Sequence, residues 1–87
     1  MQSPGLVKQV PLKFLHPEES LSRAKLTQLE LLTTEHLIRM LIPGQRDCLK
    51  SRWDGTVLDG HHRLHILQAR GVDINDLPRE IVFKTDP

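Results

Sequence analysis

Apolar and polar residues alternate over residues 6–15, which predicts a β-strand at the start of the chain. Pro11 cannot donate a ladder hydrogen bond, so this strand is expected at an edge of the sheet or at a bulge. After His16-Pro17 the apolar residues recur at helical spacing. We expect a helix that opens at residues 18–20, with two acidic residues in its first turn. Its apolar stripe consists of Leu21, Ala24, Leu29 and Leu32.

A second helix is expected over residues 34–41. Thr33 or Thr34 can accept a main-chain hydrogen bond at its start, and Pro43-Gly44 ends it. The pattern leaves open whether this helix and the preceding one form a single kinked helix.

The Asp54-Gly55 pair predicts a β-hairpin. Aspartate and glycine suit the positive φ angles of a two-residue turn. The two strands of the hairpin are expected over residues 47–53 and 56–58. A third helix then runs from residue 60 to about residue 70.

Gly71 ends this third helix, because glycine is favoured just after a helix C-cap. A loop at residues 73–78 leads to a last strand at residues 81–84. The order strand, helix, helix, hairpin, helix and strand describes a small α+β domain with a mixed sheet.

The length of 87 residues suits a single domain. We expect this domain to cover residues 6–84. Residues 1–5 are expected to form a flexible N-terminus, and residues 85–87 the C-terminal end.

Composition narrows the classes of function. The net charge of +1 and the aromatic content of 3% argue against a general basic nucleic-acid binder. The single cysteine, Cys48, excludes an internal disulfide and a four-cysteine zinc site, and fits a reducing compartment. No apolar segment approaches the roughly 20 residues of a membrane span, and the N-terminus lacks a signal-peptide pattern. We therefore expect a cytoplasmic protein without a membrane partner.

The turn Asp59-Gly60-His61-His62-Arg63 places three nitrogen-rich side chains at the start of the third helix. Free N–H groups and the helix macrodipole favour an anion there. Arg63 offers a planar fork to two phosphate oxygens, a histidine can donate to a third, and Gly60 allows close approach. Asp59 either caps the helix by accepting from the N–H of His61 or His62, or holds a Mg²⁺ ion that bridges phosphates. The turn therefore predicts phosphate binding.

Three other interpretations of this turn remain open. His61 and His65 share a helix face at zinc-ligand spacing, and Asp59 or Cys48 would add a third ligand. A divalent metal held by Asp59 and the histidines would suit a nuclease. In the simplest interpretation, Asp59 is a helix cap and the basic side chains are a solvated helix end.

The turn resembles the phosphate-binding turn of the ParB/sulfiredoxin superfamily, and the resemblance covers roughly residues 6–84. Sulfiredoxins carry Gly-Gly-Cys-His-Arg there, and ParB proteins carry Gly-Glu-Arg-Arg. Gly60 and Arg63 match both forms, and His62 matches the sulfiredoxin histidine. His61 stands where sulfiredoxins have their reactive cysteine. The resemblance implies nucleotide-phosphate binding without sulfiredoxin reductase activity, and leaves DNA a weakly supported partner because no helix-turn-helix follows.

The Asp-Gly-His-His-Arg form is similar to that of archaeal free-serine kinases in the same superfamily. Those proteins carry a Pro-His-Glu-Glu-like element after the first strand, and this chain has His16-Pro17-Glu18-Glu19 in that place. The resemblance implies that Glu18 or Glu19 acts as a general base, with Asp59 as a further candidate catalytic residue.

We therefore expect a nucleotide-binding domain in which Gly60, His61, His62 and Arg63 hold the phosphates of ATP or ADP, with CTP as a further candidate and Mg²⁺ at Asp59. As an enzyme, it would transfer a phosphoryl group to a small-molecule acceptor such as free serine. The alternative is a non-catalytic nucleotide-sensing or DNA-associated regulatory module that works through a partner. The leucine-rich middle segment leaves a homodimer open.

Overall fold

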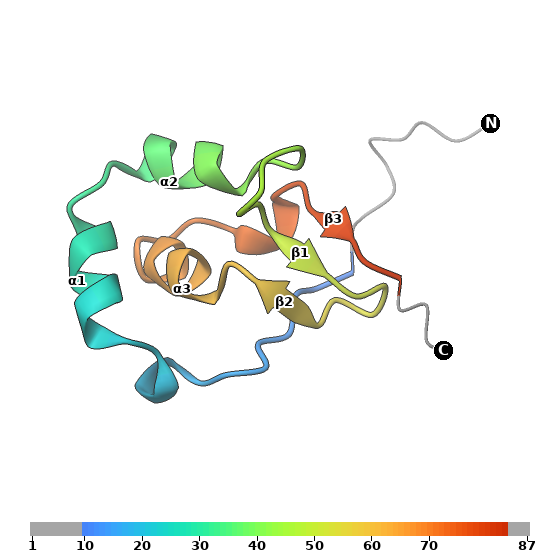
Figure 1. The fold of residues 1–87 in the computed structure, drawn as a ribbon, viewed down its shortest axis with the longest axis horizontal. Coiled ribbons are helices and arrows are strands. Elements are labelled where there is room, and N and C mark those ends of the chain that lie inside the picture. The colour runs from blue at the N-terminus through green and yellow to red at the C-terminus, as the bar shows by residue number, and fades with distance from the viewer. Residues whose placement is uncertain (1–9, 84–87) are drawn as a thin grey trace.

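The computed structural model describes residues 10–83 (Figure 1). The predictions for residues 1–5, 6–9, 84 and 85–87 lie outside the described residues. Within the described range, three α-helices pack with a three-stranded mixed sheet, which confirms the α+β class.

The first predicted helix begins later than expected. Residues Glu18–Ser20 form a separate 3₁₀ turn, η2, and helix α1 spans Arg23–Glu30. The prediction that the two glutamates occupy the first turn of this helix is wrong. Leu21 is extended (φ −85°, ψ 155°) and interrupts the helical path, and the Ser22 hydroxyl then starts α1 by accepting from the N–H of Lys25 at 3.2 Å.

Helix α2 spans Thr34–Leu41, as predicted, and is separate from α1. Its cap is Thr33, whose hydroxyl accepts from the N–H of His36 at 3.0 Å. A helix cannot run through Thr33, because this residue is extended (φ −71°, ψ 158°).

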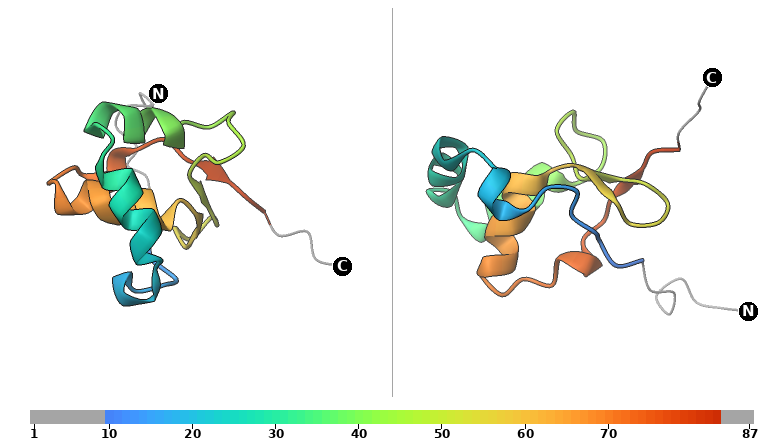
Figure 2. Two further views of the ribbon diagram at one scale, coloured as in Figure 1. Left: turned by 60° about the vertical axis from the view of Figure 1, so that its left-hand side comes forward. Right: turned by 90° about the horizontal axis from the view of Figure 1, so that it is seen from below.

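Helix α3 spans His61–Ala69 and lies centrally, with α1 and α2 on one side and the sheet on the other (Figures 1 and 2). Gly71 follows it at a φ of 89°, as expected for the residue after a C-cap. Leu64 and Leu67 of α3 have no exposed surface and form the centre of the core. The buried apolar cluster consists of Leu26, Leu37, Leu41, Leu49, Val57, Leu64, Ile66, Leu67, Ile74 and Leu77.

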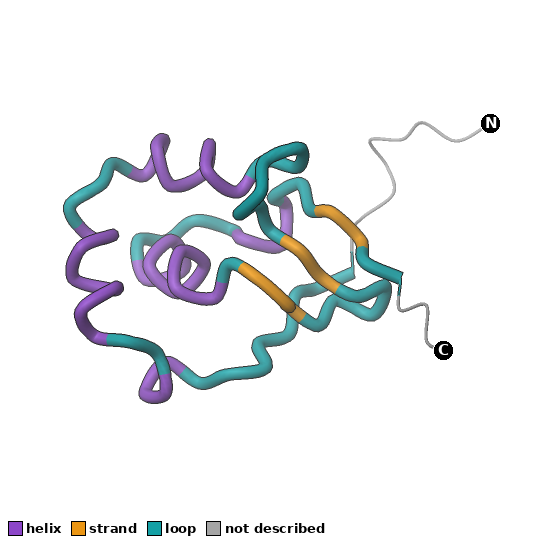
Figure 3. Tube along the Cα trace, viewed as in Figure 1, coloured by secondary structure: helices purple, strands orange, loops and turns teal. Residues whose placement is uncertain are grey.

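The sheet has the strand order β2-β1-β3 within the described residues. Strand β1 (Lys50–Ser51) pairs antiparallel with β2 (Val57–Asp59) and parallel with β3 (Glu80–Ile81). Strand β1 is shorter than the predicted range 47–53, β2 is shifted by one residue from the predicted range 56–58, and β3 begins one residue before the predicted range 81–84. Loops make up much of the chain (Figure 3). A second 3₁₀ turn, η3 (Ile74–Asp76), lies in the predicted loop.

The N-terminal strand is reduced to a single bridge in the described residues. Lys13 pairs parallel with Thr56: its N–H donates to the Gly55 carbonyl, and its carbonyl accepts from Val57, both at 2.8 Å. The segment is therefore attached to the sheet at the edge predicted from Pro11. Both hydrogen-bond partners of Lys13 belong to the hairpin.

The hairpin forms where Asp54-Gly55 predicts it, but with a different turn. The Gly55 N–H donates to the Arg52 carbonyl at 3.0 Å, which makes Trp53 and Asp54 the central residues. Arg52 N–H also donates to the Thr56 carbonyl at 2.8 Å. Of the residues between Arg52 and Thr56, only Gly55 has a positive φ (94°). The connection is therefore a three-residue loop rather than a two-residue turn.

Candidate functional site

A cleft of about 560 Å³ opens at the start of α3, between this helix, α1, α2 and the end of β2. All five residues of the predicted turn, 59–63, line it. The other lining residues are His16, Leu21, Lys25, Gln28, Leu29, Met40, Asp47 and Leu58. The cleft therefore combines cationic, apolar and acidic side chains from distant parts of the chain.

Arg63 is only 8% exposed, yet it makes no ion pair with any residue between 10 and 83. Its one hydrogen bond there runs from Nη1 to the Met40 carbonyl, at 3.3 Å. That carbonyl belongs to the last turn of α2, where the helix dipole favours a cation. A guanidinium has five N–H donors, so most of its donors have no protein acceptor in the described residues. None of its nitrogens is both enclosed and without a partner, so the remaining donors reach the solvent in the cleft and can donate to an anion there.

Lys25 and His62 line the cleft together with Arg63. Lys25, on α1, makes no ion pair with another described residue. The pKa of His62 lies below its usual value of 6.5, first because burial disfavours the charged ring and then because Lys25, His65 and Arg63 repel a proton. Two cations and a histidine that resists protonation thus line the cleft, and neither cation has a carboxylate partner in residues 10–83.

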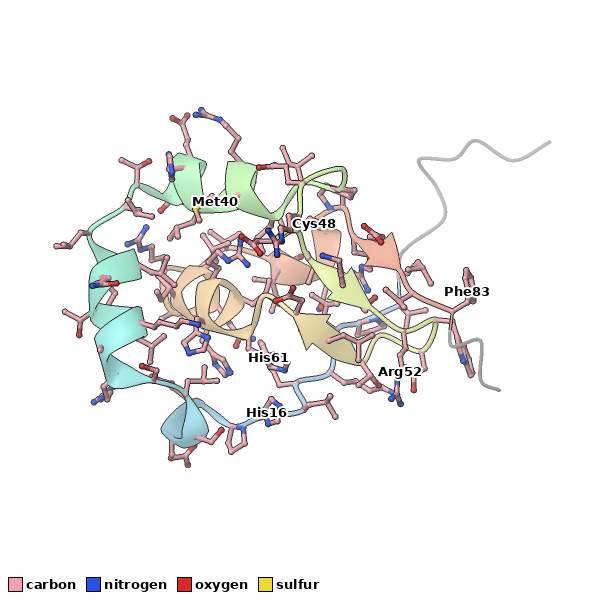
Figure 4. All side chains as sticks on the ribbon, viewed as in Figure 1. His16, Met40, Cys48, Arg52, His61 and Phe83 are labelled. Carbon is pink, nitrogen blue, oxygen red and sulfur yellow. The ribbon has the colours of Figure 1, made fainter. Side chains whose placement is uncertain are left out.

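His61 is the first residue of α3, and its side chain is buried, with 8% of its surface exposed. Its Nε2 accepts from the N–H of Leu15 at 3.3 Å, and its ring centre lies 4.9 Å from that of His16 (Figure 4). Burial is the main cause that lowers its pKa below 6.5, followed by His16, His65 and His62, while Asp59 acts in the opposite direction. His61 is therefore a neutral ring at neutral pH.

Asp59 does not cap α3, and that prediction is wrong. Strand β2 continues through Asp59, so the residue at the N-cap is Gly60, and the first turn of α3 contains no acidic residue. The Asp59 carboxylate lies instead 3.8 Å from the Lys50 ammonium group across the hairpin. The N-terminal end of α3 is consequently left without a negative side chain of its own.

Gly60 lines the cleft and also packs against the core. Its φ of 103° is rarely adopted by other residues, and a Cβ atom there would lie 3.1 Å from Cδ2 of Leu41. The close approach expected at Gly60 is therefore made by the Leu41 side chain, which packs under the turn.

Glu18 and Glu19 do not line the cleft. Both are exposed in η2 and border a separate hollow of about 470 Å³ together with Arg23. The two cleft residues nearest to them in sequence are His16 and Leu21. The predicted general base and the predicted phosphate turn thus line two separate hollows.

The residues of the zinc alternative do not come together. Among residues 10–83 no three histidine, cysteine, aspartate or glutamate side chains are grouped as a metal site. The His65 ring stacks on Phe14, with ring centres 4.1 Å apart. Cys48 is fully buried, and its thiol donates to Oε1 of Glu80 at 3.4 Å.

Sequence reasoning missed the contributions of α1 and α2. Lys25, Gln28 and Leu29 on α1 and Met40 on α2 all line the cleft. Nothing in their spacing distinguishes them from ordinary surface or core positions. The lowered pKa values of His61 and His62 were equally invisible, because they follow first from burial of the two rings in the folded chain.

Comparison of the chain with models of protein families, with curated proteins and with solved structures finds no match. None of the helices in the described part of the chain has the length and apolar character needed to cross a bilayer.

The lowered pKa values of His61 and His62 predict a dependence of stability on pH. The unfolded chain takes up protons on these residues near pH 6.5, while the folded chain resists protonation. The free energy of unfolding should therefore fall as the pH decreases from about 7.5 to about 5.5. Urea unfolding at several pH values measures this. The double variant His61→Gln with His62→Gln should flatten the dependence.

The control for this prediction is His36→Gln. His36 is an exposed histidine on α2 outside the cleft, and this variant retains both cleft histidines. It should keep the pH dependence of the unmodified chain. A double variant with an unchanged slope would show that His61 and His62 do not resist protonation in the folded state.

Proposed function

We propose that this chain binds the phosphate group of a nucleotide in the cleft at the start of α3. Arg63, His62 and His61 bind the phosphate oxygens together with the main chain that follows Gly60. The observation that carries the proposal is the buried Arg63 guanidinium, which lines the cleft without a carboxylate partner in the described residues. A phosphate would supply the missing acceptors.

The surroundings of Arg63 support an anion rather than a neutral ligand. Lys25 adds a second unpaired cation, and the first turn of α3 has N–H groups but no acidic side chain. Helix N-termini of this kind bind phosphates through main-chain N–H groups and the dipole. These contributions favour an anion, whereas the carboxylates of Asp47 and Asp59, which also line the cleft, oppose one; Asp59 is partly neutralised by Lys50.

The size and lining of the cleft support a ligand larger than phosphate. A volume of about 560 Å³ lies within the usual range for small-molecule sites. Leu21, Leu29 and Met40 give it an apolar wall beside the basic groups, where a base or ribose would lose contact with water. The resemblance of residues 59–63 to the ParB/sulfiredoxin phosphate turn agrees with a nucleotide, and ATP, ADP and CTP are the candidates to compare.

A titration series tests the proposal. Inorganic phosphate, ADP, ATP and CTP would each be added to the full chain, with and without Mg²⁺, and followed by calorimetry and by main-chain amide NMR shifts. We expect binding of the nucleotides, with the largest shifts at residues 60–63. Shifts spread over the whole surface, or none at these residues, would contradict the proposal.

Phosphoryl transfer is the second candidate function. It is favoured by the position of Glu18 and Glu19 on a segment whose residues His16 and Leu21 line the cleft. If one of them is the base, Glu18→Gln or Glu19→Gln should abolish transfer from ATP or ADP to an acceptor such as free serine. Glu35→Gln, at the start of α2, is the matched control and should leave turnover unchanged.

The same assay separates the enzyme from the regulatory module. Nucleotide binding without turnover, or a change of oligomeric state when nucleotide is added, would favour a module that acts through a partner. Turnover lost on substitution of either glutamate would favour the enzyme.

A further inference from the structure

Two neighbouring histidines hold the two ends of one segment. The N–H of Leu15 donates to Nε2 of His61 at 3.3 Å, and the N–H of Ser22 donates to Nε2 of His62 at 3.2 Å. We refer to residues 15–22 as the strap. Its residues His16 and Leu21 line the cleft, so the strap forms part of the wall facing the proposed ligand.

These two hydrogen bonds determine where each ring carries its proton. A neutral imidazole has one protonated nitrogen and one acceptor nitrogen. Since Nε2 of each ring accepts a main-chain hydrogen bond, the proton of each neutral ring must be on Nδ1. A doubly protonated ring would have no acceptor and would release its end of the strap.

We propose that the strap fixes His61 and His62 in the Nδ1–H form and thereby makes them two neutral donors for the bound anion, so that anion and strap bind cooperatively. This inference rests on the proposed phosphate site and specifies how that site is organised. The ligand group it selects is tetrahedral and rich in acceptors, as phosphate is. His61 and His62 are positioned by the strap rather than by contacts within α3.

Hydrogen bonds in series explain the cooperativity. An anion that accepts from Nδ1–H pushes electron density onto the ring and makes Nε2 a better acceptor for the strap N–H. The reverse holds by thermodynamic linkage: loss of the strap bond must weaken anion binding by the same factor.

The surrounding groups favour neutral rings over charged ones. His61 faces His16 from the strap, His65 and His62 from α3, and Asp59 from β2, and only Asp59 favours a proton. His62 faces Lys25 from α1 and His65 and Arg63 from its own helix, all of which oppose one. Burial acts in the same direction for both rings.

The first test needs no ligand. Imidazole ¹⁵N NMR of the full chain near neutral pH distinguishes the Nδ1–H form, the Nε2–H form and the charged ring. We expect the Nδ1–H form for His61 and His62, with exposed His36 as the internal reference. An Nε2–H form at either cleft histidine would overturn the proposal, even if phosphate binds.

The second test uses a matched pair at Ser22. Ser22→Ala removes the hydroxyl that caps α1 but keeps the main-chain N–H, whereas Ser22→Pro removes both. The φ of −68° at this position suits the proline ring. Relative to Ser22→Ala, we expect Ser22→Pro to release His62 from the Nδ1–H form and to weaken phosphate binding about fivefold or more. Equal affinity and an unchanged ring form in both variants would overturn the proposal.

The third test applies to the unmodified chain, so it does not depend on a variant that folds. Saturating inorganic phosphate or ADP should slow amide hydrogen exchange at Leu15 and Ser22 by about fivefold or more. The His36 amide, which donates to the Thr33 cap away from the cleft, should exchange at the same rate with and without ligand. Ligand binding without added protection at Leu15 and Ser22 would overturn the coupling alone. Failure of every phosphate ligand to bind would overturn the proposed function as well, whatever form the free rings take.

Discussion

Arg63→Met is expected to lower the affinity of the cleft for inorganic phosphate and ADP by about 10- to 100-fold. Hydrogen bonds to a charged group contribute roughly 1.5–3 kcal/mol each, and about 1.4 kcal/mol corresponds to a factor of ten. Arg63 is the most buried cation of the cleft and has only the Met40 carbonyl as a hydrogen-bond partner in the described residues. Methionine keeps much of the length of the side chain and removes its charge. Isothermal titration of each ligand measures the change.

Three controls separate binding from folding in this experiment. Arg63→Lys keeps the charge but loses the planar fork, so it should retain more affinity than methionine and less than arginine. Arg39→Met removes an exposed arginine of α2 that does not line the cleft, and should leave affinity unchanged. A thermal unfolding curve for each variant shows that the titrated protein is folded. Phosphate affinity that survives in a folded Arg63→Met protein would place the anion elsewhere.

Capping and turn signals in the sequence correctly predicted the elements whose ends are set by residues a few positions away. Thr33 caps α2 through a hydroxyl three residues from its partner, and Gly71 follows the end of α3 with the positive φ that glycine permits. The hairpin likewise formed at Asp54-Gly55 because turn chemistry is local. Such signals are present in a few consecutive residues, so a sequence is enough to find them.

The predictions of the first helix start and of the Asp59 cap were wrong because contacts between distant parts of the chain determine the structure there. The extended conformation at Leu21 separates the two glutamates from α1, and the adjacent Ser22 N–H is bound by His62, 40 residues away. Aspartate is a residue type that commonly caps helices, but Asp59 belongs to strand β2 instead. Its carboxylate consequently lies near Lys50. Neither pairing leaves a pattern in the local sequence.

The candidate site likewise has one part that local sequence predicts and one part that only the packing of distant segments creates. Residues 59–63 reach one cleft together because they are consecutive and stand at a strand-to-helix junction. Lys25 and Met40 join them only through the packing of α1 and α2 around α3, which no motif encodes. The sequence therefore predicts the chemistry of the turn. The fold adds the second cation, the apolar wall and the neutral state of the histidines.

Gly55→Ala is expected to destabilise the fold by about 2–5 kcal/mol. Gly55 has a φ of 94°, and a left-handed backbone conformation costs other residues roughly 1–2 kcal/mol. A Cβ atom at this position would also overlap the main-chain carbonyl of Pro11, so the N-terminal segment would have to move, at a further cost of about 1–3 kcal/mol. That movement would strain the hydrogen bonds that join Lys13 to the hairpin.

Gly44→Ala is the matched control for the overlap. Gly44 has a similar φ of 105°, but a Cβ atom there would meet no atom within 4 Å. Gly44→Ala should lower the free energy of unfolding only through the left-handed backbone conformation, by about 1–2 kcal/mol. The difference between the two variants therefore isolates the contact with Pro11. Urea unfolding of both variants measures this difference, and amide exchange at Lys13 reports whether the segment has separated from the hairpin. Equal losses of unfolding free energy in the two variants would mean that the N-terminal segment does not lie against Gly55 in solution. The strap that continues from this segment would then lack its anchor on the sheet.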